Sequence, residues 1–174
     1  MKKYIFTLLL FIASTFSMFA QQKSQLQLVV SGDIVGEFNF YNMDYGRIDN
    51  PDTHIPKERT LGFFSVPPTP SQNIEFAFVI ANIPGPALDT GVYDMVKVKN
   101  DFPIFDSNSK LGFITVVKTS NGTPVEEYYT VSGNITIQNV SQEVVKGEFS
   151  AILETKNSDK EISIKGNFTI ILEP

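Results

Sequence analysis

Two stretches near the C-terminus decide the fold: Val-Lys-Gly-Glu-Phe-Ser-Ala-Ile-Leu at residues 145–153 and Ile-Ser-Ile-Lys-Gly-Asn-Phe-Thr-Ile-Ile-Leu at residues 162–172. Apolar residues or glycines alternate with polar residues in both, which is the period of a β-strand with one buried face. A polar loop at 155–160 separates them, and residues 129–138 alternate in the same way. The pattern predicts three successive antiparallel strands, each with one dry and one solvated face.

A glycine two positions before a phenylalanine recurs at Gly147 and Phe149, at Gly166 and Phe168, and earlier at Gly36. Glycine and phenylalanine have the same parity, so both should lie on the buried face. A missing side chain there lets the strand coil or lets a neighbouring ring lie across the gap. We therefore interpret the repeat as architectural and not as a backbone site for a ligand.

The rest of the chain also favours strands. Residues 26–40 alternate with a possible break at 31–33, and residues 74–80 alternate up to Pro84-Gly85-Pro86, which stops a ladder. Asn121-Gly122 accepts the backbone of a type I′ turn and predicts a hairpin. Because no stretch keeps helical spacing with caps, we predict an all-β, antiparallel β-sandwich of roughly seven to nine strands, with a closed calycin-like barrel as the alternative.

Residues 1–20 resemble a secretory signal peptide, because Lys2 and Lys3 precede a short apolar run and small residues lead to Ala20. Cleavage would leave residues 21–174 as a single β-domain. The chain has no cysteine, so it has no acceptor for a lipid, no disulfide and no thiolate metal site. We expect an exported, soluble protein, periplasmic or extracellular, with no membrane span after cleavage.

The charge argues against nucleic acid as a partner. Removing Lys2 and Lys3 from the 14 basic residues leaves 12 against 19 acidic ones, a net charge near −7. No basic cluster offsets it, whereas a nucleic-acid surface requires Lys and Arg near the phosphates.

The richest polar segment is 42–60, which is long for a connection between strands. Its aspartates could offer oxygen ligands, but their spacing matches no EF-hand, so we predict neither a metal nor another cofactor. As candidate binding residues we take those of the segment that could contact a ligand: Tyr45, Arg47, Asp49, Asp52 and His54.

Catalytic arrangements are weak in this sequence, so we lean against an enzyme and name no catalytic residue. His54 is the single imidazole, and no Gly-x-Ser-x-Gly elbow occurs. Adjacent Glu126 and Glu127 should point to opposite faces of a strand, where they could not act together. Exposed tyrosines could serve a carbohydrate binder, but we expect their rings to lie on the core with the hydroxyl in water.

The C-terminal half resembles a family of exported β-sandwich domains of unknown function that are common in Bacteroidetes and often lipoproteins. The resemblance covers about residues 74–172 and rests on short motifs. These are Thr90-Gly91-Val92-Tyr93, Ser132-Gly133-Asn134-Ile135-Thr136-Ile137, Lys146-Gly147-Glu148-Phe149-Ser150 and Ile164-Lys165-Gly166-Asn167-Phe168. The missing lipid-accepting cysteine and the 42–60 segment depart from the family. It implies an exported β-sandwich and brings no activity.

We therefore predict an exported, non-enzymatic β-sandwich module that binds an unknown protein, small molecule or glycan through loops 42–60 and 81–90, since strand-end loops carry recognition on such scaffolds. Two alternatives remain open, a calycin-like barrel that holds a small molecule and a small outer-membrane β-barrel.

Overall fold

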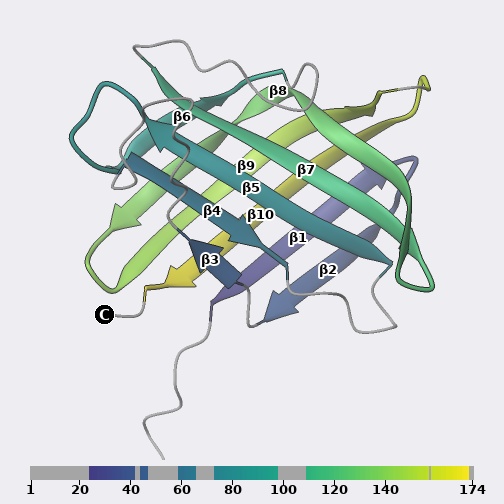
Figure 1. Cartoon of the computed structure of the whole chain (residues 1–174), viewed down its shortest axis with the longest axis horizontal. Helices are drawn as coiled ribbons and strands as arrows, with labels where there is room; N and C mark the ends of the chain where they lie inside the picture. Colours follow the sequence, from purple (N-terminus) through teal and green to yellow (C-terminus); the bar gives the residue numbers. More distant parts are fainter. Residues whose placement is uncertain are drawn as a thin grey trace, which may run out of the picture.

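A computed structural model describes residues 24–41, 44–46, 59–65, 73–97, 109–156 and 158–172. These residues form strands and almost no helix, which confirms the all-β prediction (Figure 1). In the described part of the chain, no helix is long and apolar enough to cross a membrane. The strands are β1 (Gln25–Gly32), β2 (Gly36–Tyr41), β3 (Asp44–Gly46), β4 (Thr60–Phe64), β5 (Ile74–Asn82), β6 (Gly91–Met95), β7 (Lys110–Ser120), β8 (Thr123–Val140), β9 (Val144–Thr155) and β10 (Glu161–Ile171).

All ten described strands belong to one continuous sheet, in the order β2-β1-β10-β9-β8-β6-β7-β5-β4-β3. The sheet curls into a half-barrel, whereas the sequence predicted two separate sheets of a sandwich and seven to nine strands. The alternating pattern specifies which face of a strand is buried, and a curled sheet satisfies that requirement as well as two stacked sheets do.

The short strand β6 makes the sheet mixed. Strands β7 and β8 form a hairpin that pairs from Ser120 back to Thr115. Beyond this point they separate, and β6 lies between them, antiparallel to β8 and parallel to β7. At the fork the buried Thr130 hydroxyl donates to the Ile114 carbonyl and accepts from the Ile114 amide, at 2.8 and 2.7 Å. The threonine side chain thus replaces the backbone pairing that the fork removes.

The curl brings distant strands face to face. Figure 1 shows β4, β5 and β7 running across β1, β10 and β9, as in orthogonal sheet packing. The two ends of the strand order, β2 and β3, are separated in sequence only by residues 42 and 43. Three Cα steps of about 3.8 Å place Tyr41 and Asp44 at most about 11 Å apart. The edges of the sheet therefore approach each other at this point.

Phenylalanine rings fill the space between the two crossing walls. Phe78 on β5 lies 4.8 Å from Phe168 on β10, and Phe76 stacks 5.4 Å from Phe149 on β9, measured between ring centroids. Phe63 on β4 lies 6.3 Å from Phe168. All five rings are at most 3 % exposed, so each contributes about 1.5–3 kcal/mol through burial. These contacts hold the curl, because they join strands that share no hydrogen bonds.

The structure confirms the architectural interpretation of the Gly-x-Phe repeat for its two C-terminal copies, whereas Gly36 and Phe38 of the first copy are only partly buried. Gly166 is the cross-strand partner of Phe149, and Gly147 is the partner of Phe168. A Cβ added to Gly147 would stand 2.7 Å from Cζ of Phe168. Each ring thus lies over the glycine of the neighbouring strand.

The predicted hairpin turn at Asn121-Gly122 is also confirmed. Both residues have positive φ, 52° and 75°, as a type I′ turn requires. The turn joins β7 to β8.

Candidate functional site

The structure describes only one of the five binding residues predicted in the 42–60 segment. Tyr45 lies on the edge strand β3, and its ring is partly buried against the core. Arg47, Asp49, Asp52 and His54 lie outside the described residues. The binding role of this segment therefore stays a prediction.

The second predicted loop, 81–90, is held in place by its own side chains. The buried Asn82 amide donates to the Ala87 carbonyl at 2.6 Å and accepts from the Gly85 amide at 3.1 Å. Arg59 donates to the Ile83 carbonyl at 2.7 Å. These bonds fix the crossing from β5 to β6, which passes over β7. These residues of the loop therefore stabilise the fold, and the binding role of the loop is still a prediction.

Tyr93 closes the same crossing from inside the core. Its hydroxyl donates to the Asp89 carbonyl at 2.9 Å and accepts from the Asp89 amide at 3.2 Å, which is the arrangement called a tyrosine corner. Burial raises the pKa of Tyr93 to about 12. Tyr128 is equally buried, so both rings lie on the core as expected, while Tyr41 is 63 % exposed. The expectation that the hydroxyls reach water is wrong for the two buried tyrosines, because the Tyr93 hydroxyl bonds to Asp89 and the Tyr128 hydroxyl to Glu126.

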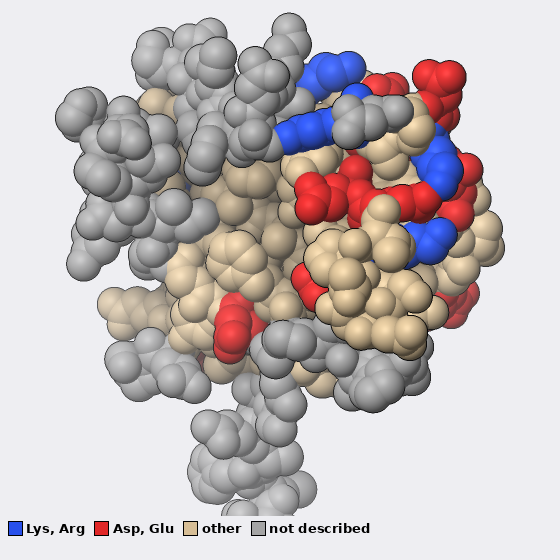
Figure 2. All heavy atoms as spheres, turned by 45° about the vertical axis from the view of Figure 1, so that its right-hand side comes forward, with Lys and Arg blue, Asp and Glu red and all other residues tan. Residues whose placement is uncertain are grey.

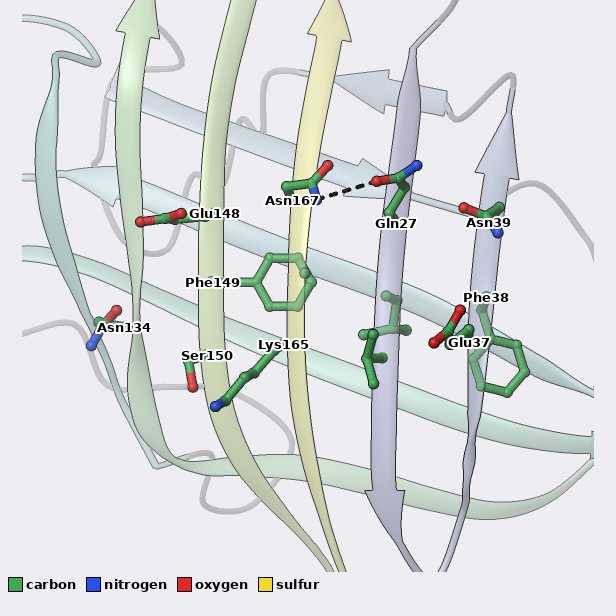
Figure 3. A pocket seen from close by; sticks show the side chains of 13 residues that line it. Gln27, Glu37, Phe38, Asn39, Asn134, Glu148, Phe149, Ser150, Lys165 and Asn167 are labelled. Atoms are coloured by element: carbon green, nitrogen blue, oxygen red, sulfur yellow. Dashed lines mark hydrogen bonds between the residues drawn. The ribbon is translucent and has the colours of Figure 1, made fainter.

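A hollow of about 760 Å³ lies on the outer, solvated face of the sheet, across β2, β1, β10, β9 and β8 (Figure 3). Two rows of exposed cross-strand partners line it, and between them lies a third row of residues that face the core: Phe38, Leu28, Gly166 and Phe149. The first row is Asn39, Gln27, Asn167 and Glu148, and the second is Glu37, Val29, Lys165, Ser150 and Asn134. We call this hollow, defined by these nine side chains, the polar hollow.

The first row is a line of amides that ends in a carboxylate. Its members are direct partners on four successive strands, so Figure 3 shows Asn39, Gln27, Asn167 and Glu148 side by side. Asn167 donates through Nδ2 to Oε1 of Gln27 at 3.3 Å. The contact uses one donor and one acceptor, so the two amides keep their other groups for a ligand.

The second row contains an acidic residue, a basic residue and an exposed apolar residue, Val29. Lys165 stands between Val29 on β1 and Ser150 on β9, and Glu37 lies beyond Val29. Val29 is 53 % exposed. One lysine against Glu37 and Glu148 gives the polar hollow a formal charge of −1, so it is polar but nearly neutral.

The two carboxylates of the polar hollow are too far apart for glycoside hydrolysis. Glu37 on β2 and Glu148 on β9 are three strands apart, which at about 4.8 Å per strand is roughly 14 Å. Catalytic pairs are about 5–9.5 Å apart. In the described part of the chain, no three Asp, Glu or His side chains gather where they could hold a metal.

The adjacent carboxylates Glu126 and Glu127 bind different partners, as expected for side chains on opposite faces of a strand. Glu126 accepts from Lys160, from Tyr128 at 2.9 Å and from Lys118 at 3.4 Å. Glu127 instead accepts from the Tyr129 hydroxyl. The lysine and tyrosine hydrogen bonds lower the pKa of Glu126 to about 2, with Lys160 making the largest contribution.

This cluster lies where the β7–β8 hairpin approaches the loop between β9 and β10, beside a second hollow of about 370 Å³. On the face shown in Figure 2, Lys and Arg side chains are interspersed with Asp and Glu. Such a mixture is typical of a solvated surface, and Glu126 forms ion pairs with Lys118 and Lys160 there.

No protein family model matches the chain, and neither a curated protein nor a solved structure shows significant similarity to it. The resemblance to exported Bacteroidetes domains therefore stays an expectation.

Sequence reasoning missed the polar hollow, although it assigned most of its residues correctly. Asn134 and Asn167 were expected on the solvated face, and both are exposed. The alternating pattern does not give the register between distant strands, and it is this register that places Gln27 opposite Asn167, 140 residues later. One sequence signal could have indicated the site. Several strands carry Asn or Gln at solvated positions, where a charged residue would satisfy the fold equally well.

Proposed function

We propose that the chain is an exported, non-enzymatic, sandwich-like β-module that binds a ligand or an envelope partner through the polar hollow. The observation that carries this proposal is the continuous row of Asn39, Gln27, Asn167 and Glu148 across four strands. Function on such a scaffold lies in sites, and polar groups that converge on a hollow are the groups that orient a bound ligand.

The packing of the interior favours a surface site over the alternatives considered from sequence. A ligand-holding calycin-like barrel needs an internal cavity, but here the rings of Phe63, Phe76, Phe78, Phe149 and Phe168 occupy the centre. An outer-membrane barrel is apolar outside and polar inside. The strands that line the polar hollow have the reverse arrangement, with amides on the outer face and phenylalanines on the inner face.

The 42–60 segment remains a second candidate surface. It begins where β2 ends and returns to the sheet at β4, and Tyr45 fixes its start on β3.

The proposal is tested by retention of envelope components on immobilised protein, together with assays for turnover of glycans, esters and peptides. We expect saturable retention that falls when Gln27 and Asn167 are both replaced by alanine. A double variant in which Gln138 and Asn139 are replaced is the matched control, because both are exposed β8 residues outside the polar hollow. Turnover abolished by a single Asp, Glu or His substitution would overturn the non-enzymatic assignment.

A further inference from the structure

We propose that the ligand of the polar hollow is a neutral oligosaccharide that lies across the strands, along the row of Asn39, Gln27, Asn167 and Glu148. This inference rests on the proposed function and names the ligand class for the same site. Four observations support it: the chemistry of the row, its regular spacing, the nearly neutral charge and the apolar patch at Val29.

The chemistry of the row matches hydroxyl groups. A sugar hydroxyl donates one hydrogen bond and accepts others, and a primary amide likewise offers two donors and a carbonyl acceptor. The contact between Asn167 Nδ2 and Gln27 Oε1 aligns these two amides on neighbouring strands. Neighbouring hydroxyls of one sugar ring can then be met by two adjacent side chains, while the Glu148 carboxylate accepts from hydroxyls at the end of the row.

The spacing suits a chain of sugars better than a single one. Neighbouring strands are about 4.8 Å apart, so the four side chains of the row extend over roughly 14 Å. The separation of adjacent side chains is of the same order as the length of one pyranose unit. Several linked sugars can therefore repeat the same contacts from strand to strand.

The other ligand classes fit the polar hollow less well. Nucleic acid and other polyanions would meet Glu37 and Glu148 with one lysine between them, and such ligands require a positive surface. A protein interface is built around large apolar or aromatic anchors that a partner can reach. Of the apolar residues that line the polar hollow, Val29 is 53 % exposed, whereas Leu28 and Phe149 are buried and Phe38 is partly buried against the core. Val29 is suited to the C–H face of a sugar ring, which leaves the hydroxyls to the amides.

The test is a titration of the 15N-labelled protein with neutral gluco-, manno- and xylo-oligosaccharides of increasing length. The side-chain amide signals of Gln27, Asn39, Asn134 and Asn167 report binding directly. We expect them to shift for at least one series, with affinity that rises with chain length and then levels off once the row is covered. Raising the salt concentration should leave the affinity unchanged, because the ligand is uncharged.

Substitutions then locate the site. Asn167→Ala and Gln27→Ala should each weaken binding at least about tenfold, the loss of one well-made hydrogen bond to a ligand. Gln138→Ala removes an exposed amide outside the polar hollow and should have no effect. Thermal unfolding of each variant checks that the fold is kept.

Three results would overturn the inference: no binding by any of the neutral series, shifts confined to the 42–60 segment, or binding that both hollow variants retain. These results are distinguishable from failure of the proposed function. If a protein component of the envelope binds and is lost in the Gln27 and Asn167 double variant, the binding module stands and only the oligosaccharide is rejected.

Discussion

The ring of Phe149 on β9 lies over Gly166 on β10, its direct cross-strand partner. A Cβ at position 166 would stand 2.5 Å from Cζ of Phe149 and 2.4 Å from the carbonyl oxygen of Gln27. A rotamer change could move the ring, but it could not move the backbone oxygen. The close approach of three strands at this point therefore depends on the glycine.

Gly166→Ala should lower the free energy of unfolding by about 2 kcal/mol or more, because the added methyl group overpacks the core and presses on backbone. Urea denaturation measures the change. Gly46→Ala on β3 is the matched control, since a Cβ there would meet nothing within 4 Å, and we expect a change within about 0.5 kcal/mol. Equal effects of the two substitutions would contradict the role given to Phe149.

The buried face of each strand could be predicted from sequence, because it depends only on whether a residue occupies an odd or an even position along the strand. In β9 the buried positions are Val145, Gly147, Phe149, Ala151 and Leu153, which are the residues expected on the dry face. A strand has two faces, and one of them must be dry, so a few residues are enough to assign it. The Asn121-Gly122 turn was predictable for a similar reason, since only its own backbone is involved.

The order of strands and the polar hollow could not be predicted, because both depend on pairings between distant segments. Nothing in the alternation of 25–32 shows that β1 pairs with β10, or that β6 enters the fork between β7 and β8. A sandwich and a curled sheet also bury the same residues. The amide row appears only when the register of four strands is known.

Thr130 closes the fork between β7 and β8, so Thr130→Val should be costly although the two side chains have nearly the same shape. The substitution leaves the amide and carbonyl of Ile114 without the hydroxyl that now bonds both. We expect a loss of about 2 kcal/mol in chemical denaturation. Thr136→Val, at a partly exposed position of the same strand, should cost much less. A similar loss at both positions would mean that the hydroxyl of Thr130 is unimportant.

Tyr93 ties the crossing from β5 to β6 to the core, and Tyr93→Phe removes only its hydroxyl. The Asp89 amide and carbonyl then lose their partner, so we expect the unfolding free energy to fall by about 1 kcal/mol. Tyr41→Phe, at a residue 63 % exposed, should be neutral. Spectrophotometric titration gives a second readout, because burial raises the pKa of both Tyr93 and Tyr128, so the number of late-ionising tyrosines should fall by one in Tyr93→Phe.

Glu126 should make stability depend on pH in the acid range. Its pKa is lowered from 4.5 to about 2 in the folded protein, chiefly by the hydrogen bond from Lys160. A carboxyl with a lowered folded pKa stabilises the fold above its unfolded pKa, and this contribution is lost as the pH falls from about 4.5 towards 2. The melting temperature of wild type should therefore exceed that of Glu126→Gln at neutral pH, and the two should converge in acid. Glu143→Gln, on the exposed turn between β8 and β9, controls for removal of a surface carboxylate. A constant difference between wild type and Glu126→Gln down to pH 2 would show that Lys160 does not stabilise the ionised carboxylate.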